Sequence, residues 1–181
     1  MDNGASSYRR YLDGEEAAFE QIVRDYFDPL IGFIDSYVHD ESVAEDIAID
    51  TFSDLIVHKH RYNFRVSLKT YLFMIGRSRA LNYIKRRSRF QMVELDLAER
   101  ELPEVSSPEI LYDNCQRDQA VRDALTQLHS DMQETVYLVY FEEMSCADAA
   151  KVMRKTVKQV YNLLYRAKTA LRTILAEEIE L

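Results

Sequence analysis

Apolar residues recur every three or four positions along most of the chain. Between positions 19 and 33 this spacing is typical of an amphipathic helix. The segment Ser42-Val43-Ala44-Glu45 has the form of a capping box, so it predicts a helix that begins there and continues through Leu55. A third helix is predicted from about Ser67 to Arg87, with apolar residues along one side. The apolar positions of the first and third helices include Phe19, Ile22, Val23, Tyr26, Leu30, Phe33, Leu68, Leu72 and Ile75.

The helical spacing is lost between residues 91 and 107, where the chain becomes acidic and contains Pro103. Ser107-Pro108 then has the form of a helix start, with proline in the first turn. We therefore predict a flexible linker over 91–107, which joins a first domain at 10–90 to a second at 108–181.

The second half contains three further helix-start signals, Ser130–Gln133, Ser145–Asp148 and Thr156–Gln159. They predict a long helix near 131, a short one over 146–153 and another from 157. The last two helices, with a turn at Arg154-Lys155, have the lengths of a helix-turn-helix. The predicted fold class is all-α, with an N-terminal helical bundle and a C-terminal helix-turn-helix domain.

Composition supports a folded, intracellular chain. The 181 residues are 47% hydrophobic, which is enough for one ordinary domain or two small ones with real cores. No run of about 18 apolar residues predicts a membrane span, and the polar N-terminus has no signal-peptide core. The two cysteines, Cys115 and Cys146, are too few for a disulfide framework. We expect a cytoplasmic protein.

Charge is distributed unevenly. The net charge of −8 argues against nucleic-acid binding, and thirteen acidic residues against one basic residue lie between 13 and 54. In contrast, residues 77–89 contain six basic residues and 151–172 contain seven, with no acidic residue in either range. Two separate basic segments predict two contacts with a polyanion. Solvated helix faces are the alternative interpretation of either segment.

The helix predicted from 157 has one polar face and one apolar stripe. The stripe consists of Val157, Val160, Leu164, Ala167 and Leu171 and is predicted to face the core. Amide and guanidinium groups on the opposite face could pair with base edges in the major groove, and lysines could meet phosphates. An amphipathic helix with a solvated face is the alternative. The predicted major-groove residues are Lys155, Lys158, Gln159, Tyr161, Asn162, Tyr165 and Arg166.

Two features of the first half suggest complementary contacts. Aromatic residues alternate with cations over 60–65, as suits single-stranded DNA, although Tyr62 and Phe64 could instead be core residues. Asp46, Asp50 and Asp54 share one helix face, which predicts a protein-docking surface or, alternatively, a solubilising face.

Taken together, these segments resemble extracytoplasmic-function (ECF) sigma factors of bacterial RNA polymerase. Residues 43–52 resemble the helix that docks on the clamp coiled coil of the polymerase largest subunit. The run 68–77, with Lys85-Arg86-Arg87 after it, resembles the stretch that opens the promoter −10 element. Residues 140–145 and 160–168 resemble the helix-turn-helix that reads the −35 element and touches the polymerase flap.

The resemblance implies an alternative sigma factor that binds core RNA polymerase and directs promoter-specific initiation. It implies −10 contacts by Tyr62, Phe64, Arg65, Tyr71, Arg77, Ser78, Arg79, Lys85, Arg86 and Arg87. It implies polymerase contacts by Glu45, Asp46, Ile49, Asp50, Phe52, Ser53 and Asp54. The chain departs from the family at Ile49-Asp50, where Gln-Glu is usual, and at Tyr71, where tryptophan is common. We expect no further domain after residue 175, so any sensing is assigned to a separate anti-sigma protein.

Other functions are less consistent with the residues. The chain has no Gly-rich phosphate loop, nucleophile motif or metal-ligand cluster, so we expect neither an enzyme nor a cofactor or metal site. One alternative is a sigma-like mimic that binds an anti-sigma factor without reading a promoter. Another is a stand-alone helix-turn-helix regulator.

Overall fold

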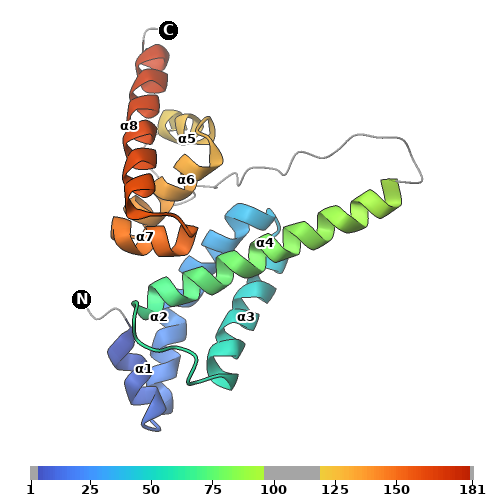
Figure 1. Ribbon diagram of the computed structural model, residues 1–181, viewed down its shortest axis with the longest axis vertical. Helices are drawn as coiled ribbons and strands as arrows, with labels where there is room; N and C mark the ends of the chain where they lie inside the picture. The colour runs from blue at the N-terminus through green and yellow to red at the C-terminus, as the bar shows by residue number, and fades with distance from the viewer. Residues whose placement is uncertain (1–3, 96–118, 180–181) are drawn as a thin grey trace. The chain divides into compact units, whose positions relative to one another are not determined.

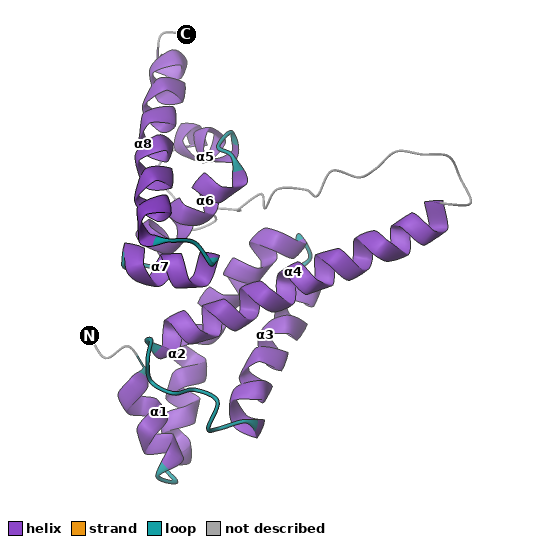
Figure 2. Ribbon diagram, in the orientation of Figure 1, coloured by secondary structure: helices purple, strands orange, loops and turns teal. Residues whose placement is uncertain are grey.

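Helices joined by short loops make up the residues that the structure, a computed structural model, describes: 4–95 and 119–179 (Figures 1 and 2). No strand occurs within these ranges. They belong to two compact units. The first comprises α1 (Ala5–Leu12), α2 (Glu16–Val38), α3 (Glu41–Val57) and α4 (Leu68–Leu95). The second comprises α5 (Gln119–Thr126), α6 (Ser130–Val136), the π-helix η1 (Tyr137–Phe141), α7 (Cys146–Met153) and α8 (Val157–Ile179). The predicted all-α class with two helical domains is confirmed.

The third predicted helix is longer at its C-terminal end than its apolar spacing indicated. α4 begins as expected after Ser67, whose Oγ accepts a hydrogen bond from the Thr70 N–H at 3.0 Å. It continues through Leu95, so residues 91–95 are helical and that part of the predicted linker is wrong. Residues 96–107 of the predicted linker lie outside the described residues.

The core of the first unit forms where α2 lies against α1, α3 and α4. The Phe33 and Phe73 rings, from α2 and α4, have centroids 4.9 Å apart and are both fully buried. Gly76 lets these two helices approach closely, because a Cβ there would lie 2.9 Å from Leu30 Cδ1. A larger residue at this position would push α4 away from α2.

The cap of α3 differs from the prediction. Asp40, not Ser42, is the N-cap residue, and its Oδ1 accepts a hydrogen bond from the Val43 N–H at 3.2 Å. α2 ends at His39 with a left-handed backbone, φ 53°, so Asp40 is the first residue that can begin a new helix. The capping box predicted at Ser42 is therefore wrong by two positions.

The N-terminal helix α1 was not predicted. It contributes Tyr8 to the core, and the Tyr8 side chain is fully buried. The signal was weak, since only Tyr8, Tyr11 and Leu12 break a short polar segment. Because α1 packs on α2, the first unit begins earlier than the predicted bound at residue 10.

In the second unit, α8 packs against α5, α6 and α7. Ser145 caps α7, with its Oγ accepting from the Asp148 N–H at 3.1 Å. Thr156 and Gln159 cap α8 reciprocally: Thr156 Oγ1 accepts from the Gln159 N–H at 3.2 Å, and Gln159 Oε1 accepts from the Thr156 N–H at 2.8 Å. Both predicted starts, and the turn at Arg154-Lys155, are confirmed.

The predicted capping box at Ser130 is wrong by one position, because His129 is the N-cap of α6. Gln133 does not reach back to that cap. Its amide Nε2 instead donates to the carbonyls of Thr126 and Leu128, at 3.0 and 2.8 Å. Gln133 therefore ties α6 to the end of α5 rather than capping its own helix.

The α8 capping box gives a test of local stability. Thr156→Ala removes the hydroxyl acceptor of the cap, so we expect the second unit to lose about 1 kcal/mol of unfolding free energy. Thr169→Ala is the matched control, because the Thr169 hydroxyl bonds the Tyr165 carbonyl inside α8 and caps nothing. Urea unfolding of both variants measures the difference, and equal losses would contradict the role of the cap.

Candidate nucleic-acid and protein interfaces

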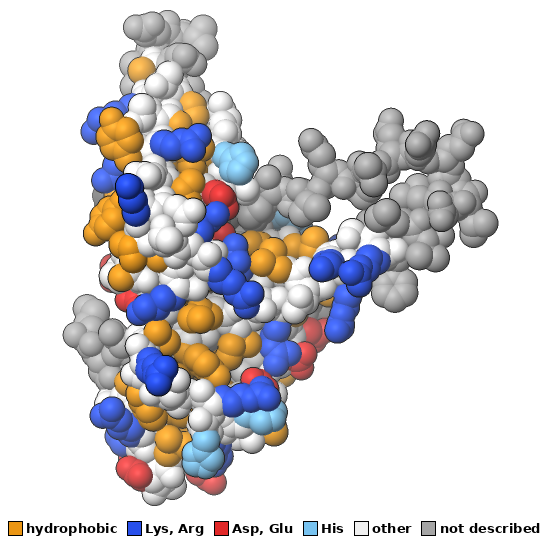
Figure 3. Space-filling view, viewed as in Figure 1, with side chains coloured by type: hydrophobic (Ala, Val, Ile, Leu, Met, Phe, Trp, Pro, Cys, Tyr) orange, Lys and Arg blue, Asp and Glu red, His pale blue; other side chains and the backbone are white. Residues whose placement is uncertain are grey.

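The polar face of α8 is exposed much as its sequence predicts. Val160 and Ala167 are fully buried, while Tyr165 on the outer face is 73% exposed. Val157 is an exception, because it is the first residue of α8 and is 42% exposed rather than buried in the stripe. Figure 3 shows Lys and Arg side chains distributed along α8. The exposed residues of the predicted face are Lys158, Gln159, Tyr161, Asn162, Tyr165 and Arg166.

Two of the predicted major-groove residues also have structural partners. Lys155 Nζ lies 2.9 Å from Asp131 Oδ2, so this lysine joins the turn before α8 to α6. Gln159 uses its Oε1 in the capping box described above. Asn162 and Arg166 lie about one and two turns farther along α8 than Gln159, and both are exposed.

The acidic face of α3 is exposed, with one correction. Asp46, Ile49 and Asp50 are exposed, as are Glu45 and Ser53. Phe52 is only 5% exposed, because its ring packs against Phe19 and Phe27 with centroid distances of 6.4 and 5.7 Å. Phe52 is thus a core residue in this structure and not part of the surface.

The exposed face also extends farther than predicted, to the C-terminal end of α3. Ile56 is 42% exposed and Val57 is 73% exposed. Both continue the spacing of three and four residues from Ile49 and Ser53, which was the signal available in the sequence. The surface is therefore acidic over its first turns and apolar at its end.

Asp54 lies at the edge of this surface and connects three segments. Its side chain is 17% exposed, and its Oδ1 lies 2.9 Å from His58 Nδ1, 3.2 Å from Arg61 Nη1 and 3.9 Å from Arg79 Nη2. Arg79 also lies 3.8 Å from Asp50. Cations of the following loop and of α4 thus lie beside the acidic face of α3. They offset the repulsion between its carboxylates.

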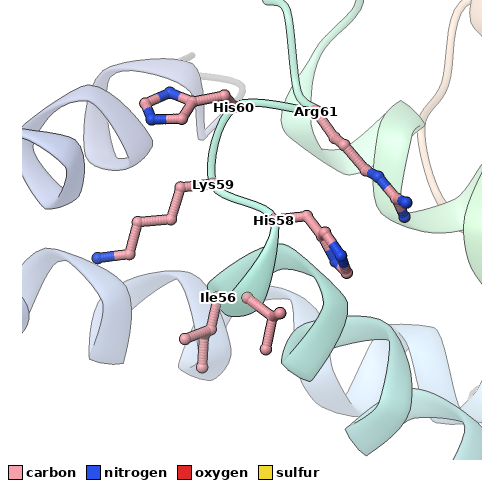
Figure 4. A pocket seen from close by; sticks show the side chains of 6 residues that line it. Ile56, His58, Lys59, His60 and Arg61 are labelled. Atoms are coloured by element: carbon pink, nitrogen blue, oxygen red, sulfur yellow. The ribbon is translucent and has the colours of Figure 1, made fainter.

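The residues after α3 form a shallow pocket next to this surface. It is lined by Ile56 and Val57 together with residues 58–61. In Figure 4, Lys59 and His60 extend to one side of the chain, while His58 and Arg61 extend to the other. The pocket therefore combines an apolar wall with a cationic edge.

Tyr62 is buried in an aromatic cluster, so it does not offer a free face for base stacking. It is 2% exposed, and its ring centroid lies 5.4 Å from Tyr8, 4.7 Å from Phe64 and 5.1 Å from Tyr71. Its hydroxyl donates to the Val66 carbonyl at 2.7 Å. The alternative interpretation of Tyr62 as a core residue is the one that its burial supports, whereas Arg65 next to this cluster is exposed.

Tyr8 belongs to this aromatic cluster, and its hydroxyl lies within hydrogen-bonding distance of two carbonyls. It is 3.1 Å from the Leu55 oxygen and 2.9 Å from the Lys59 oxygen. Burial, with smaller contributions from neighbouring tyrosines, raises the pKa of Tyr8 from its ordinary 10.0 to about 12. Tyr8 therefore remains a neutral hydrogen-bond donor at any physiological pH.

The raised pKa predicts a loss of stability in alkali. A group with a higher pKa in the folded chain stabilises it fully below pH 10, and this contribution is lost as the pH rises toward 12. We expect the unfolding free energy of the wild-type chain to fall more steeply over this range than that of Tyr8→Phe. Urea unfolding at stepped pH measures both slopes, and parallel slopes would contradict the assignment.

α4 carries the remaining predicted −10 residues. Arg77 and Ser78 are partly exposed, as is Tyr71. Lys85, Arg86 and Arg87 are exposed, and Figure 3 shows Lys and Arg side chains near the far end of this helix. The basic end of α4 thus extends beyond α2 and α3 (Figure 1).

Neither a metal-ligand cluster nor a membrane-spanning helix occurs in the described ranges. No three His, Cys, Asp or Glu side chains there gather in a way that could hold a metal ion. In the same ranges, no helix has the length and apolar character needed to cross a membrane.

Comparison with known proteins identifies both units. The Sigma-70 region 2 family matches residues 22–90, and the Sigma-70 region 4 family matches residues 118–171. RNA polymerase sigma-H factor of Pseudomonas aeruginosa is 27% identical over an alignment of 172 residues, which covers 90% of this chain and 88% of that protein. ECF RNA polymerase sigma factor SigM of Bacillus subtilis is 23% identical over an alignment of 163 residues, which covers 86% of this chain and 93% of that protein.

Solved structures support the fold. A sigma factor RpoE in complex with the anti-sigma factor NepR, from Bartonella quintana, aligns with a TM-score of 0.65 at 22% identity, covering 87% of this chain and 96% of that one. CnrH in complex with the cytosolic domain of CnrY aligns with a TM-score of 0.64 at 22% identity, covering 97% and 99%. With regions 2 and 4 in order on two helical units, the chain belongs to the ECF group of sigma-70 factors.

Proposed function

We propose that this sigma factor holds core RNA polymerase with α3 and grips a promoter at two places, with α4 and its preceding loop at the −10 element and with α8 at the −35 element. As an alternative sigma factor it directs transcription initiation. The proposal assigns that activity to particular surfaces. The observation that carries it is the separation of charge, with an acidic and apolar face on α3 and acid-free basic segments on α4 and α8.

The three surfaces suit three different partners. Carboxylates with exposed Ile49 and Val57 suit a basic protein surface that also buries apolar area, as proposed for the polymerase clamp coiled coil. The α8 face suits duplex DNA, because amide and guanidinium groups can read base edges from the major groove. The second unit is also proposed to touch the polymerase flap.

The basic end of α4 suits the strand that opens at the −10 element. Lys85, Arg86 and Arg87 are exposed together and would meet phosphates. Arg65 lies exposed in the loop before α4 and would hold the same strand. In this proposal the polymerase carries out all bond formation, and the sigma factor itself is not an enzyme.

We also propose where the chain works and what regulates it. The chain works in the cytoplasm, where promoter DNA and polymerase are found. An anti-sigma protein is the proposed regulator, and one structure of similar fold was solved with such a partner. Burial of the α3 face or of the α8 face by that partner would prevent initiation.

A transcription assay with purified components tests the function. The full chain and bacterial core polymerase are mixed, and promoters are identified by mapping the transcripts that depend on the added chain. A sigma factor gives run-off products from defined start sites and co-purifies with core polymerase. Co-purification without any product would favour the anti-sigma-binding mimic. No co-purification would favour a stand-alone regulator and refute the proposal.

A further inference from the structure

The loop between α3 and α4 has a defined conformation that its own residues only partly explain. The Asn63 side chain accepts from the Arg65 N–H at 3.2 Å, which forms a local turn. Phe64 has a left-handed backbone, φ 60°, which is unfavourable for a residue with a bulky side chain. The loop therefore needs outside contacts to keep Phe64 in this state.

α1 supplies those contacts, mainly through Tyr8. The Tyr8 ring lies 5.4 Å from the Tyr62 ring and 6.1 Å from the Phe64 ring. Its hydroxyl reaches the Leu55 carbonyl in the last turn of α3 and the Lys59 carbonyl at the start of the loop. One buried side chain thus touches both the beginning and the middle of the loop.

A second contact from α1 lies at the outer side of the same loop. The Arg9 guanidinium carbon lies 4.9 Å from the centroid of the Phe64 ring, in a cation–π arrangement. The adjacent Arg10 forms an ion pair with Glu15. Arg9 therefore adds a contact with the loop, and Arg10, its neighbour in sequence, is paired with Glu15.

We infer that Tyr8 is a positioning residue, which holds the loop at 58–66 in the conformation that presents Asn63 and Arg65 to the promoter strand. The inference rests on the proposed role of this loop at the −10 element. A loop that is ordered before binding loses less conformational entropy when it captures a strand. α1, which precedes the residues matched to region 2, would thus act on promoter opening without touching DNA.

Hydrogen exchange of the full chain tests the positioning directly. Tyr8→Phe keeps the ring and removes the donor, so exchange in peptides covering 58–66 should become about five- to tenfold faster. The matched control is Ile34→Val, because Ile34 is fully buried on α2 against Gly76 and its truncation has a similar cost to global stability. Equal acceleration in both variants, or none in Tyr8→Phe, would overturn the inference.

The second measurement is binding of holoenzyme to the single −10 strand of a mapped promoter. For Tyr8→Phe we expect about five- to tenfold weaker binding of this strand, with unchanged affinity for core polymerase. Ile34→Val should leave both values unchanged. If the affinity for the −10 strand changes with global stability and not with the exchange rate of the loop, then Tyr8 has only a structural role.

A second pair of variants covers the case in which Tyr8→Phe does not fold. Arg9→Ala should accelerate exchange in 58–66 without unfolding the chain, since Arg9 is exposed, and Arg10→Ala should not. Identical behaviour of the two arginine variants would overturn the inference. The exchange measurements use no polymerase and no DNA, so their failure is distinct from a failure of the proposed function.

Discussion

Replacing Asp46 and Asp50 together by lysine is expected to weaken binding to core RNA polymerase by about 100-fold or more. Both carboxylates are exposed on one face of α3, four residues apart. If this face meets a basic surface of the clamp, reversal turns two attractions into two repulsions, and like charges at an interface cost several kcal/mol. Titration of labelled core polymerase with each protein gives the two Kd values.

The control separates a local effect from a change in total charge. Glu16→Lys with Glu20→Lys has the same spacing and charge change on α2, where both side chains are exposed. It should leave the affinity for core polymerase nearly unchanged. Asp50 lies 3.8 Å from Arg79, but an exposed pair at this distance contributes at most about 1 kcal/mol, so the α3 variant should still fold. Equal losses of affinity in the two double variants would move the docking surface away from α3.

The helix-turn-helix could be predicted from the sequence because its signals are local. Ser145 and Thr156 each lie next to the helix that they cap, and the hydrogen-bond partners are three residues away. A local signal can still be ambiguous. Asp40 and Ser42 are both good N-cap residues, and the choice between them depends on where α2 ends.

The burial of individual aromatic residues could not be predicted in the same way. Tyr62 was assigned to the −10 contacts with a core position as the alternative, and Phe52 was assigned to the docking surface. Both are buried by rings that come from distant segments. Tyr62 packs against Tyr8 of α1, a helix whose existence the short polar N-terminal segment did not indicate. Helical spacing identifies which residues share a face, but only the packed structure shows which aromatic residues that face buries.

The same limit applies to the charged residues. Carboxylates on one face of α3 repel each other, and the sequence did not identify the cations that offset this repulsion. In the structure they are Arg61 of the loop and Arg79 of α4. Arg79 had been assigned to DNA. Its contacts with Asp50 and Asp54 show that this cation of α4 also offsets the charge of the acidic face of α3.

Arg166→Ala is expected to weaken holoenzyme binding to a promoter by about 10- to 100-fold, without changing its affinity for core polymerase. Arg166 is exposed on α8, on the face that contains Asn162 and about three turns from the cap at Thr156. A guanidinium that pairs with a base edge contributes about 1–3 kcal/mol of discrimination, and one that pairs with phosphate also steepens the dependence on salt. Binding of holoenzyme to duplex promoter DNA at several salt concentrations distinguishes these two contributions.

Arg172→Ala is the matched control, since Arg172 is exposed on the same helix but lies six residues farther from its N-terminal end. The N-terminal part of a recognition helix enters the major groove, so this variant should bind nearly as well as the wild-type chain. If Arg166 reads a base, its loss should weaken binding to the wild-type −35 sequence more than to a sequence changed at one position. Uniform weakening on all sequences would assign Arg166 to phosphate, and no weakening would remove this face of α8 from the promoter interface.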